Sequence, residues 1–172
     1  MSNTFTKEKR ILAIDPTTKG FGFAVMEGPE RLIDWGVKGA KRSKKMRCLK
    51  LIMGLIDHYK PDVIVVEDYD GKDSRRCRRV QKLINRIQKL GLEKRIMTRS
   101  FSRSAVRKAF SPPGAFTKHQ IATAIAQRLP ELAPRLPPFR KPWMSEDYRM
   151  SIFDAVSFAL TFFYFENKKR AV

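Results

Sequence analysis

The sequence predicts an α/β fold in which a five-stranded mixed sheet is flanked by helices. Two observations lead to this prediction. Three short apolar stretches separated by turn residues open the chain, which is typical of an antiparallel meander. Further along, segments with helical periodicity alternate with apolar runs, which is typical of strands added in parallel. The 172 residues, 42% of them hydrophobic, are enough for one buried core, and we expect a flexible tail over residues 1–9 and a single domain over 10–168.

The expected strands are apolar runs that end at turn residues. They cover residues 11–15, 21–26, 31–37, 63–66 and 95–98. The first three form the meander, with a turn over residues 16–20 between the first two. The run 63–66 is β-branched throughout, which is typical of a strand buried on both faces.

Helical periodicity predicts helices over residues 43–59, 74–90, 102–110, 117–129 and about 145–166. Ser102 is expected to cap the third of these helices. Thr117 and Gln120 have the spacing of a capping box at the start of the fourth. Residues 130–142 contain five prolines, so we expect no regular structure there.

Charge is the most unusual property of the composition. Lys and Arg total 36 against 17 Asp and Glu, a formal net charge of +19. Self-repulsion of this size opposes compaction, so a polyanionic partner is expected, with nucleic acid favoured over an anionic membrane surface or a merely basic, soluble protein. The apolar run 152–165 is too short to span a membrane. The N-terminus has no signal-peptide pattern, and Cys48 and Cys77 have no metal-binding spacing, so a reduced, cytoplasmic setting is expected.

Three acidic residues lie where an ionised carboxylate is unfavourable. Asp15 and Glu67 each end an apolar strand, and Asp154 lies in a helix that is apolar almost all round. A buried carboxylate needs a cationic partner or a metal ion. A salt bridge to one of the many arginines would explain any one of them alone. Three together in one small basic chain indicate a site for two Mg²⁺ or Mn²⁺ ions that hydrolyses phosphodiesters.

Four motifs in order resemble the RuvC family of Holliday junction resolvases. Residues 11–25, with the Asp15-Pro16 turn and the later Gly-aromatic-small step, resemble its first two strands. Residues 61–67 resemble the strand that ends in its catalytic Glu. Val106-Arg107 followed by residues 114–121 resembles its basic segment, and Asp154-Ala155 resembles the start of its last catalytic helix. The resemblance implies an RNase H-like fold and metal-dependent cleavage of four-way DNA junctions by a homodimer.

The same resemblance implies a fourth metal ligand one helical turn before Asp154, where this chain has Ser151. Asp147, two turns before Asp154 in the expected helix, is a candidate substitute, and Glu146 beside it is a less favoured one. The alternative for Asp147 is a plain charge at a helix N-terminus. The resemblance also implies an aromatic side chain soon after Glu67 that stacks at the junction, and Tyr69 lies near that place.

Two basic groups are the expected DNA contacts. The first is on the helix after Glu67 and comprises Arg75, Arg76, Arg79 and Lys82. The second surrounds the expected site, with Arg107 and Lys118 expected near the cleaved phosphate; its other members are Arg99, Arg103 and Lys108. A solvated helix face is the alternative for the first group. Two other functions remain open: an RNase H-fold nuclease acting on other DNA or RNA substrates, and a nucleic-acid-binding module whose catalysis is weakened by the loss of an acid at Ser151.

Overall fold

The computed structural model describes residues 7–39, 45–72 and 74–172 of the chain. Five strands form one mixed sheet with the order β3-β2-β1-β4-β5. The strands are β1 (Arg10–Thr17), β2 (Gly20–Glu27), β3 (Leu32–Gly39), β4 (Val63–Glu67) and β5 (Met97–Phe101). β1 to β3 are antiparallel neighbours, and β4 and β5 are added in parallel beside β1. The predicted fold class is confirmed.

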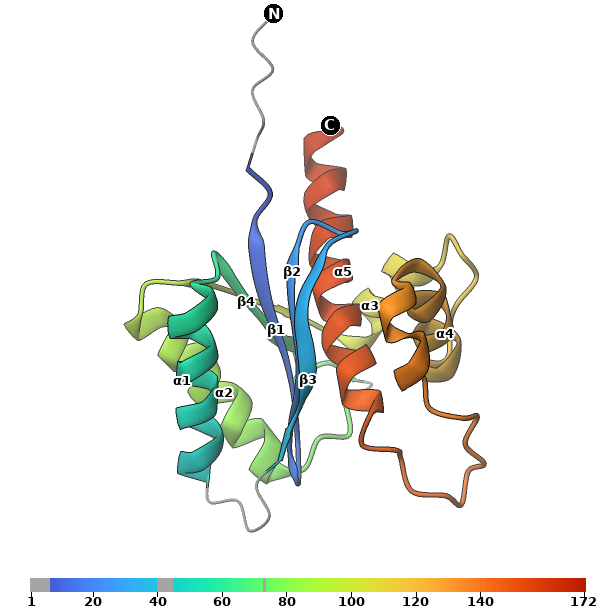
Figure 1. Cartoon of the computed structure of the whole chain (residues 1–172), viewed down its shortest axis with the longest axis horizontal. Helices are drawn as coiled ribbons and strands as arrows, with labels where there is room; N and C mark the ends of the chain where they lie inside the picture. The colour runs from blue at the N-terminus through green and yellow to red at the C-terminus, as the bar shows by residue number, and fades with distance from the viewer. Residues whose placement is uncertain (1–6, 40–44, 73) are drawn as a thin grey trace, which may run out of the picture.

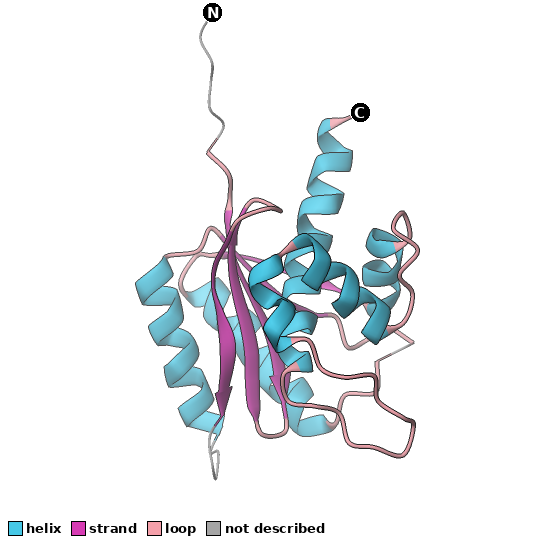
Figure 2. Ribbon diagram, turned by 45° about the vertical axis from the view of Figure 1, so that its right-hand side comes forward, coloured by secondary structure: helices cyan, strands magenta, loops and turns pink. Residues whose placement is uncertain are grey.

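Helices cover both faces of this sheet (Figure 1). The helices are α1 (Lys45–Tyr59), α2 (Arg78–Glu93), α3 (Arg103–Phe110), α4 (Lys118–Arg128), the 3-10 helix η1 (Pro130–Arg135) and α5 (Met150–Arg170). α1 and α2 pack on one face of the sheet, and α5 packs on the other. α3 and α4 contact the side of α5 that is turned away from the sheet (Figure 2). None of the helices in the described part of the chain is long and apolar enough to cross a membrane.

The strands alternate their side chains between two hydrophobic cores. In β1, Ile11 and Ala13 face α5, whereas Leu12 and Ile14 face α1 and α2. All four side chains are fully buried, so β1 lies at the centre of the molecule. The same alternation directs the next residue of β1, Asp15, to the α5 side.

A glycine allows α5 to lie close against the sheet. Gly22 in β2 pairs with Asp15 in β1. A Cβ atom at Gly22 would come within 2.3 Å of the backbone carbon and oxygen of Ser151, in the first turn of α5. The missing side chain therefore lets the start of α5 pack directly beside Asp15, and this brings Asp154 to the same end of the sheet.

Both predicted helix caps are confirmed. The Ser102 hydroxyl accepts a hydrogen bond from the backbone N–H of Ala105 at 3.2 Å. Thr117 and Gln120 form the reciprocal capping box at the start of α4. These caps fix where α3 and α4 begin, and each begins with a basic residue, Arg103 or Lys118.

Several predicted boundaries are wrong. β1 continues through Pro16, so the turn that was expected over residues 16–20 is reduced to two residues. Residues 130–142 do contain regular structure, because Pro130 is tolerated at the first position of η1. β5 begins two residues later than expected and α2 four residues later. The expected helix start at residue 43 and residues 1–6 of the expected tail lie outside the described residues.

The start of the last helix is also corrected. The helix was expected from about Ser145, but α5 begins at Met150. Asp147 instead forms a turn: its carboxylate accepts the backbone N–H of Arg149 at 2.9 Å, and its carbonyl accepts the N–H of Met150 at 3.0 Å. Side-chain acceptance of a nearby backbone N–H competes with helix formation, so the helix starts only where the apolar run starts.

Candidate active site

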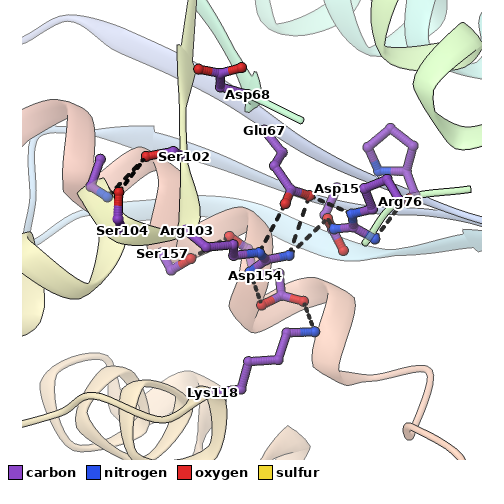
Figure 3. A network of polar contacts seen from close by, with 12 residues as sticks. Asp15, Glu67, Asp68, Arg76, Ser102, Arg103, Ser104, Lys118, Asp154 and Ser157 are labelled. Atoms are coloured by element: carbon purple, nitrogen blue, oxygen red, sulfur yellow. Dashed lines mark hydrogen bonds and ion pairs between the residues drawn. The ribbon is translucent and has the colours of Figure 1, made fainter. Parts of the chain in front are cut away.

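Three carboxylates meet at the carboxyl ends of β1 and β4. Asp15 lies near the end of β1 and Glu67 is the last residue of β4, and the alternation of both strands directs them to the face that α5 covers. Asp154 lies on α5 opposite them (Figure 3). The exposed fractions of Asp15, Glu67 and Asp154 are 1%, 1% and 5%. Carboxylates buried to this degree require strong compensation.

Two arginines lie between the carboxylates. Arg76, just before α2, donates hydrogen bonds to both Asp15 and Glu67. Arg103, the first residue of α3, donates from Nε to Glu67 Oε1 at 3.1 Å and from Nη1 to Asp154 Oδ1 at 2.9 Å. Figure 3 shows the guanidinium group of Arg103 surrounded by the three acids. Each carboxylate is therefore charge-paired to at least one guanidinium group.

Lys118 provides a third cation. Its Nζ lies 2.9 Å from Asp154 Oδ2 and 2.8 Å from Glu146 Oε1. Asp154 Oδ2 is buried and, among the described residues, accepts no hydrogen bond of good geometry, so the contact with Lys118 is electrostatic. The three buried acids and the three cations Arg76, Arg103 and Lys118 have formal charges that cancel.

Burial and these neighbours move the pKa values of two acids in opposite directions. Burial raises the pKa of Asp15 to about 7, although Arg76 acts against it, and the charge of Asp154 adds to the rise. Burial would also raise the pKa of Asp154, but Arg103 and Lys118 outweigh it and hold that pKa at about 2. One acid of the pair is thus strongly anionic and the other accepts a proton near neutral pH.

The donor chemistry of the three acids fits a hard divalent cation. Mg²⁺ prefers carboxylate and water oxygens, and the buried Asp154 Oδ2 accepts no well-aligned hydrogen bond among the described residues, although Lys118 Nζ lies 2.9 Å away. In the present arrangement, the described residues include no group of three acidic, His or Cys side chains at metal-binding geometry. The guanidinium groups of Arg76 and Arg103 instead lie between the acids (Figure 3).

The two candidates for a fourth ligand have different partners. Asp147 is paired with Arg149, whose Nη2 donates to its Oδ2 at 2.7 Å, and Arg149 holds the Asp147 pKa below its usual range. Its expected place on the face of a helix is wrong, because it precedes α5. Glu146 shares Lys118 with Asp154 and so is connected to the three acids. Ser151 Oγ donates to the Tyr148 carbonyl at 2.8 Å.

The residues expected to contact DNA fall into two classes. Arg75, Arg79 and Lys82 are exposed. A cavity of about 430 Å³ borders the carboxylates, and its lining includes Arg107 and Lys118 together with Glu67, Arg75, Arg76, Arg103 and Glu146. The side chain of Tyr69 packs partly against the core under α1 and α2, and its hydroxyl donates to Asn85 at 2.7 Å.

Sequence reasoning did not single out Arg103 or the inward position of Arg76. Arg103 was one of several basic residues near the expected site, and nothing in its immediate sequence distinguishes it from Arg107. The one available signal was the Ser102 cap, which makes Arg103 the first residue of α3, directly after β5. Arg76 was expected on an exposed helix face, but it precedes the helix and turns inward.

No known family model matches the chain, and no curated protein sequence matches it. Solved structures do match. The RuvC structure of Thermus thermophilus aligns with a TM-score of 0.66 at 17% identity, over 93% of this chain and 96% of that one. T. thermophilus RuvC in complex with a Holliday junction substrate aligns with a TM-score of 0.68 at 16% identity, over 94% and 96%. The yeast mitochondrial Holliday junction resolvase Ydc2 aligns with a TM-score of 0.68 at 16% identity, over 98% and 83%. The chain therefore has the RuvC fold.

Proposed function

We propose that this chain is a divalent-metal-dependent endonuclease that cleaves four-way DNA junctions. The observation that carries the proposal is the meeting of Asp15, Glu67 and Asp154, all buried, at one end of a sheet with the RuvC fold. A net charge of +19 supports a polyanionic substrate. Action on a two-fold symmetric junction further supports a homodimer, and we extend the proposal to a cytoplasmic setting.

The three carboxylates would hold the metal ions, with Glu146 as the better connected fourth acid and Asp147 as the alternative. Bound divalent ions would supply an activated water nucleophile and neutralise charge on the phosphate. Water then adds to phosphorus, one P–O bond to the sugar breaks, and the leaving oxygen takes up a proton. Burial of the acids at 5% exposure or less keeps bulk water from competing for their oxygens.

The cations around the acids would have separate tasks. Lys118, which is half-buried between Asp154 and Glu146, would contact the cleaved phosphate. Arg107 borders the same cavity and would hold a neighbouring phosphate. Arg103 contacts all three acids within 3.9 Å and lies over the ring of Phe158 at 5.1 Å, so it would keep the acids in position.

Arg76 would have to withdraw before metal ions bind. Its guanidinium group lies on Asp15 and Glu67, where ions would be held. Since the charges of the site already cancel, two added divalent ions would leave an excess of positive charge. Withdrawal of Arg76 and entry of a DNA phosphate each reduce that excess by one charge. Metal binding is therefore expected to be stronger with DNA present than without it.

A second function is favoured by the same contacts. A chain whose acids stay paired with Arg76 and Arg103, and which has Ser151 instead of an acid, would bind junction DNA without cutting it. An RNase H-fold nuclease for flaps or RNA–DNA hybrids is the third alternative, because the strand order fits both substrate classes.

One experiment separates these functions. Four-way junction, duplex, flap and RNA–DNA hybrid are incubated with the protein in Mg²⁺ or Mn²⁺, and products are resolved on denaturing gels. We expect symmetric nicking of the junction and at least a 100-fold loss of rate in Asp15→Asn. Asp57→Asn is the matched control, because Asp57 lies on the surface of α1 and pairs with Lys94 at 2.9 Å.

Three results would revise the proposal. Tight junction binding without cleavage in either metal would establish the binding module instead. Preferred cleavage of flap or hybrid would establish the alternative nuclease. Cleavage that persists in Asp15→Asn would refute the assignment of the site. Comparing Glu146→Gln with Asp147→Asn tests the fourth ligand, since we expect only the first to lower the rate.

A further inference from the structure

The loop between η1 and α5 exposes large aromatic side chains beside the carboxylates. Residues 136–144 form this segment, called here the aromatic loop, which projects from the molecule near the start of α5 (Figures 1 and 2). Phe139 and Trp143 are 74% and 77% exposed. Two rings exposed to this extent on one short loop are unusual for a surface without a binding role.

Local contacts support the shape of the loop. Pro137 is buried, and its carbonyl lies 3.3 Å from Nε2 of His119 on α4. The ring of His119 meets the Phe139 ring edge-on at 5.4 Å between centroids. At the other end, the Met144 N–H donates to the Lys141 carbonyl at 3.0 Å. The exposed rings are thus carried on a supported turn rather than on an unrestrained segment.

The charge of the aromatic loop is positive. It contains Arg140 and Lys141 and no acidic residue. Lys141 Nζ lies 5.3 Å from the centre of the Trp143 ring, so a cation accompanies the ring. Aromatic rings that accept stacked bases, with cations beside them for the phosphates, are the common design of surfaces that bind single-stranded nucleic acid.

A small cavity connects the loop to the candidate active site. Its volume is about 190 Å³, and Phe139 and His119 line it together with Thr117, Lys118, Pro137, Pro138, Arg140, Glu146, Asp147 and Met150. Lys118 contacts Asp154, so the cavity and the carboxylates share a wall. The volume is of the size of one nucleobase, and the lining combines apolar rings with polar groups, as in small-ligand pockets.

We infer that the aromatic loop and this cavity bind an unstacked nucleobase next to the cleaved phosphate. The inference rests on the proposed function, because the continuous stacking of base pairs is interrupted where DNA strands branch. Phe139 receives the base at the mouth of the cavity, and Trp143 stacks on a second base or on the same strand further out. Contacts to base edges carry sequence information whereas phosphate contacts do not, so this cavity is where a cleavage preference would arise.

Phe139 and Trp143 lie at a different position from Tyr69, the residue that the sequence suggested for stacking at the junction. The ring of Tyr69 packs partly against the core under α1 and α2, and its hydroxyl is held by Asn85. Phe139 and Trp143 have most of their surface available.

Trp143 allows a direct test, because the chain contains only two tryptophans. Trp35→Phe leaves Trp143 as the sole indole fluorophore. The indole emission is followed during titration with a ten-nucleotide thymidine oligomer. A second titration uses a four-way junction and a protein that also carries Asp15→Asn. We expect saturable quenching, and about a tenfold weaker affinity for the oligomer in Phe139→Leu. Phe116→Leu is the matched control, since Phe116 is 57% exposed but does not line the cavity.

The results separate the loop from the proposed nuclease function. Junction cleavage with no quenching and unchanged affinity in Phe139→Leu would overturn base binding while the nuclease stands. Quenching without any cleavage by the parent chain would support base binding and refute the nuclease. A changed oligomeric state of Trp143→Leu in sedimentation without DNA would overturn the inference in favour of a second copy. Quenching or a blue shift with phosphatidylserine vesicles alone would overturn it in favour of a membrane surface.

Discussion

Arg75 and Arg76 are neighbours in the sequence but differ completely in their surroundings. Arg75 is exposed, whereas Arg76 bonds to two buried carboxylates and has 17% of its side chain exposed. Lys82 and Arg79 on α2 are exposed like Arg75, and Arg103 is mostly buried like Arg76, with 15% of its side chain exposed. The large positive charge of the chain therefore divides between counter-ions for the site and cations on the surface.

Substitutions in the two classes are expected to change different measured quantities. Those in the buried class should change stability, and those in the exposed class should change the salt dependence of DNA binding. A buried ion pair contributes mainly by avoiding an uncompensated charge in a poorly solvated place. An exposed cation contributes little to stability and acts through salt-dependent attraction of phosphates. The net charge of the chain does not distinguish buried cations from exposed ones, so substitutions are needed to tell the two classes apart.

The largest effect is expected for Arg103. Arg103→Ala leaves Glu67 and Asp154 without their shared guanidinium group, and breaking such a buried pair lowers the free energy of unfolding by about 3–5 kcal/mol. Chemical denaturation measures this change. Arg99→Ala on the exposed part of β5 is the control, with a change within about 0.5 kcal/mol. Equal losses in both variants would remove the distinction between buried and exposed cations.

Lys118 lies between the two classes, since it is 39% exposed and contacts both Asp154 and Glu146. Lys118→Met is expected to lower the junction cleavage rate about 100-fold, the effect of removing one group that stabilises transition-state charge. The thermal stability of the Lys118→Met variant is expected to change little, because partly exposed ion pairs contribute little to the free energy of unfolding. Single-turnover cleavage and thermal unfolding are measured on the same sample. A large loss of stability with an unchanged rate would make Lys118 a structural residue.

Arg76→Ala is expected to strengthen Mn²⁺ binding about tenfold in the absence of DNA. The reason is that the guanidinium group of Arg76 repels the metal ion, and removing about 1.4 kcal/mol of repulsion raises the affinity tenfold. Isothermal titration calorimetry measures the affinity directly. Arg75→Ala is the adjacent control and should leave it unchanged. Weaker binding in Arg76→Ala would show that this guanidinium group orders the acids rather than competing with metal ions.

The smallest effect per residue is expected on the exposed class. The triple variant Arg75→Gln, Arg79→Gln and Lys82→Gln should bind junction DNA with a salt dependence that is less steep by about one unit of log–log slope per cation removed. Fluorescence anisotropy at several salt concentrations gives the slope. Metal affinity and unfolding should match those of the parent chain. An unchanged slope would assign these residues to a solvated helix face.

The positions of the three acids could be predicted from the sequence because burial and polarity conflict there. Asp15 and Glu67 end apolar strands, and Asp154 interrupts an apolar helix. The mixed sheet could be predicted for a related reason, since hydrophobic periodicity separates strands from helices and reports which faces are buried. Patterns of this kind depend only on local sequence.

The contacts of the cations could not be predicted in this way. Arg76 and Arg103 reach the acids from two loops whose geometry depends on tertiary packing, and a long flexible side chain leaves no periodic signal. The start of α5 was misplaced because Asp147 bonds to the backbone of Arg149. Five prolines obscured η1, although a proline at its first position is compatible with a helical turn.

The packing of Ser151 against Gly22 has a consequence for how the protein is made. α5 is buried along the whole stretch from Met150 to Phe163, and the elements that cover it, chiefly β1, β2, α3 and α4, all precede it in the chain. Asp154 is therefore the last of the three acids along the chain, and it can meet Asp15 only when α5 is docked on the sheet. We expect a chain cut before Met150 to keep most of its Lys and Arg residues and still lack the group of three carboxylates.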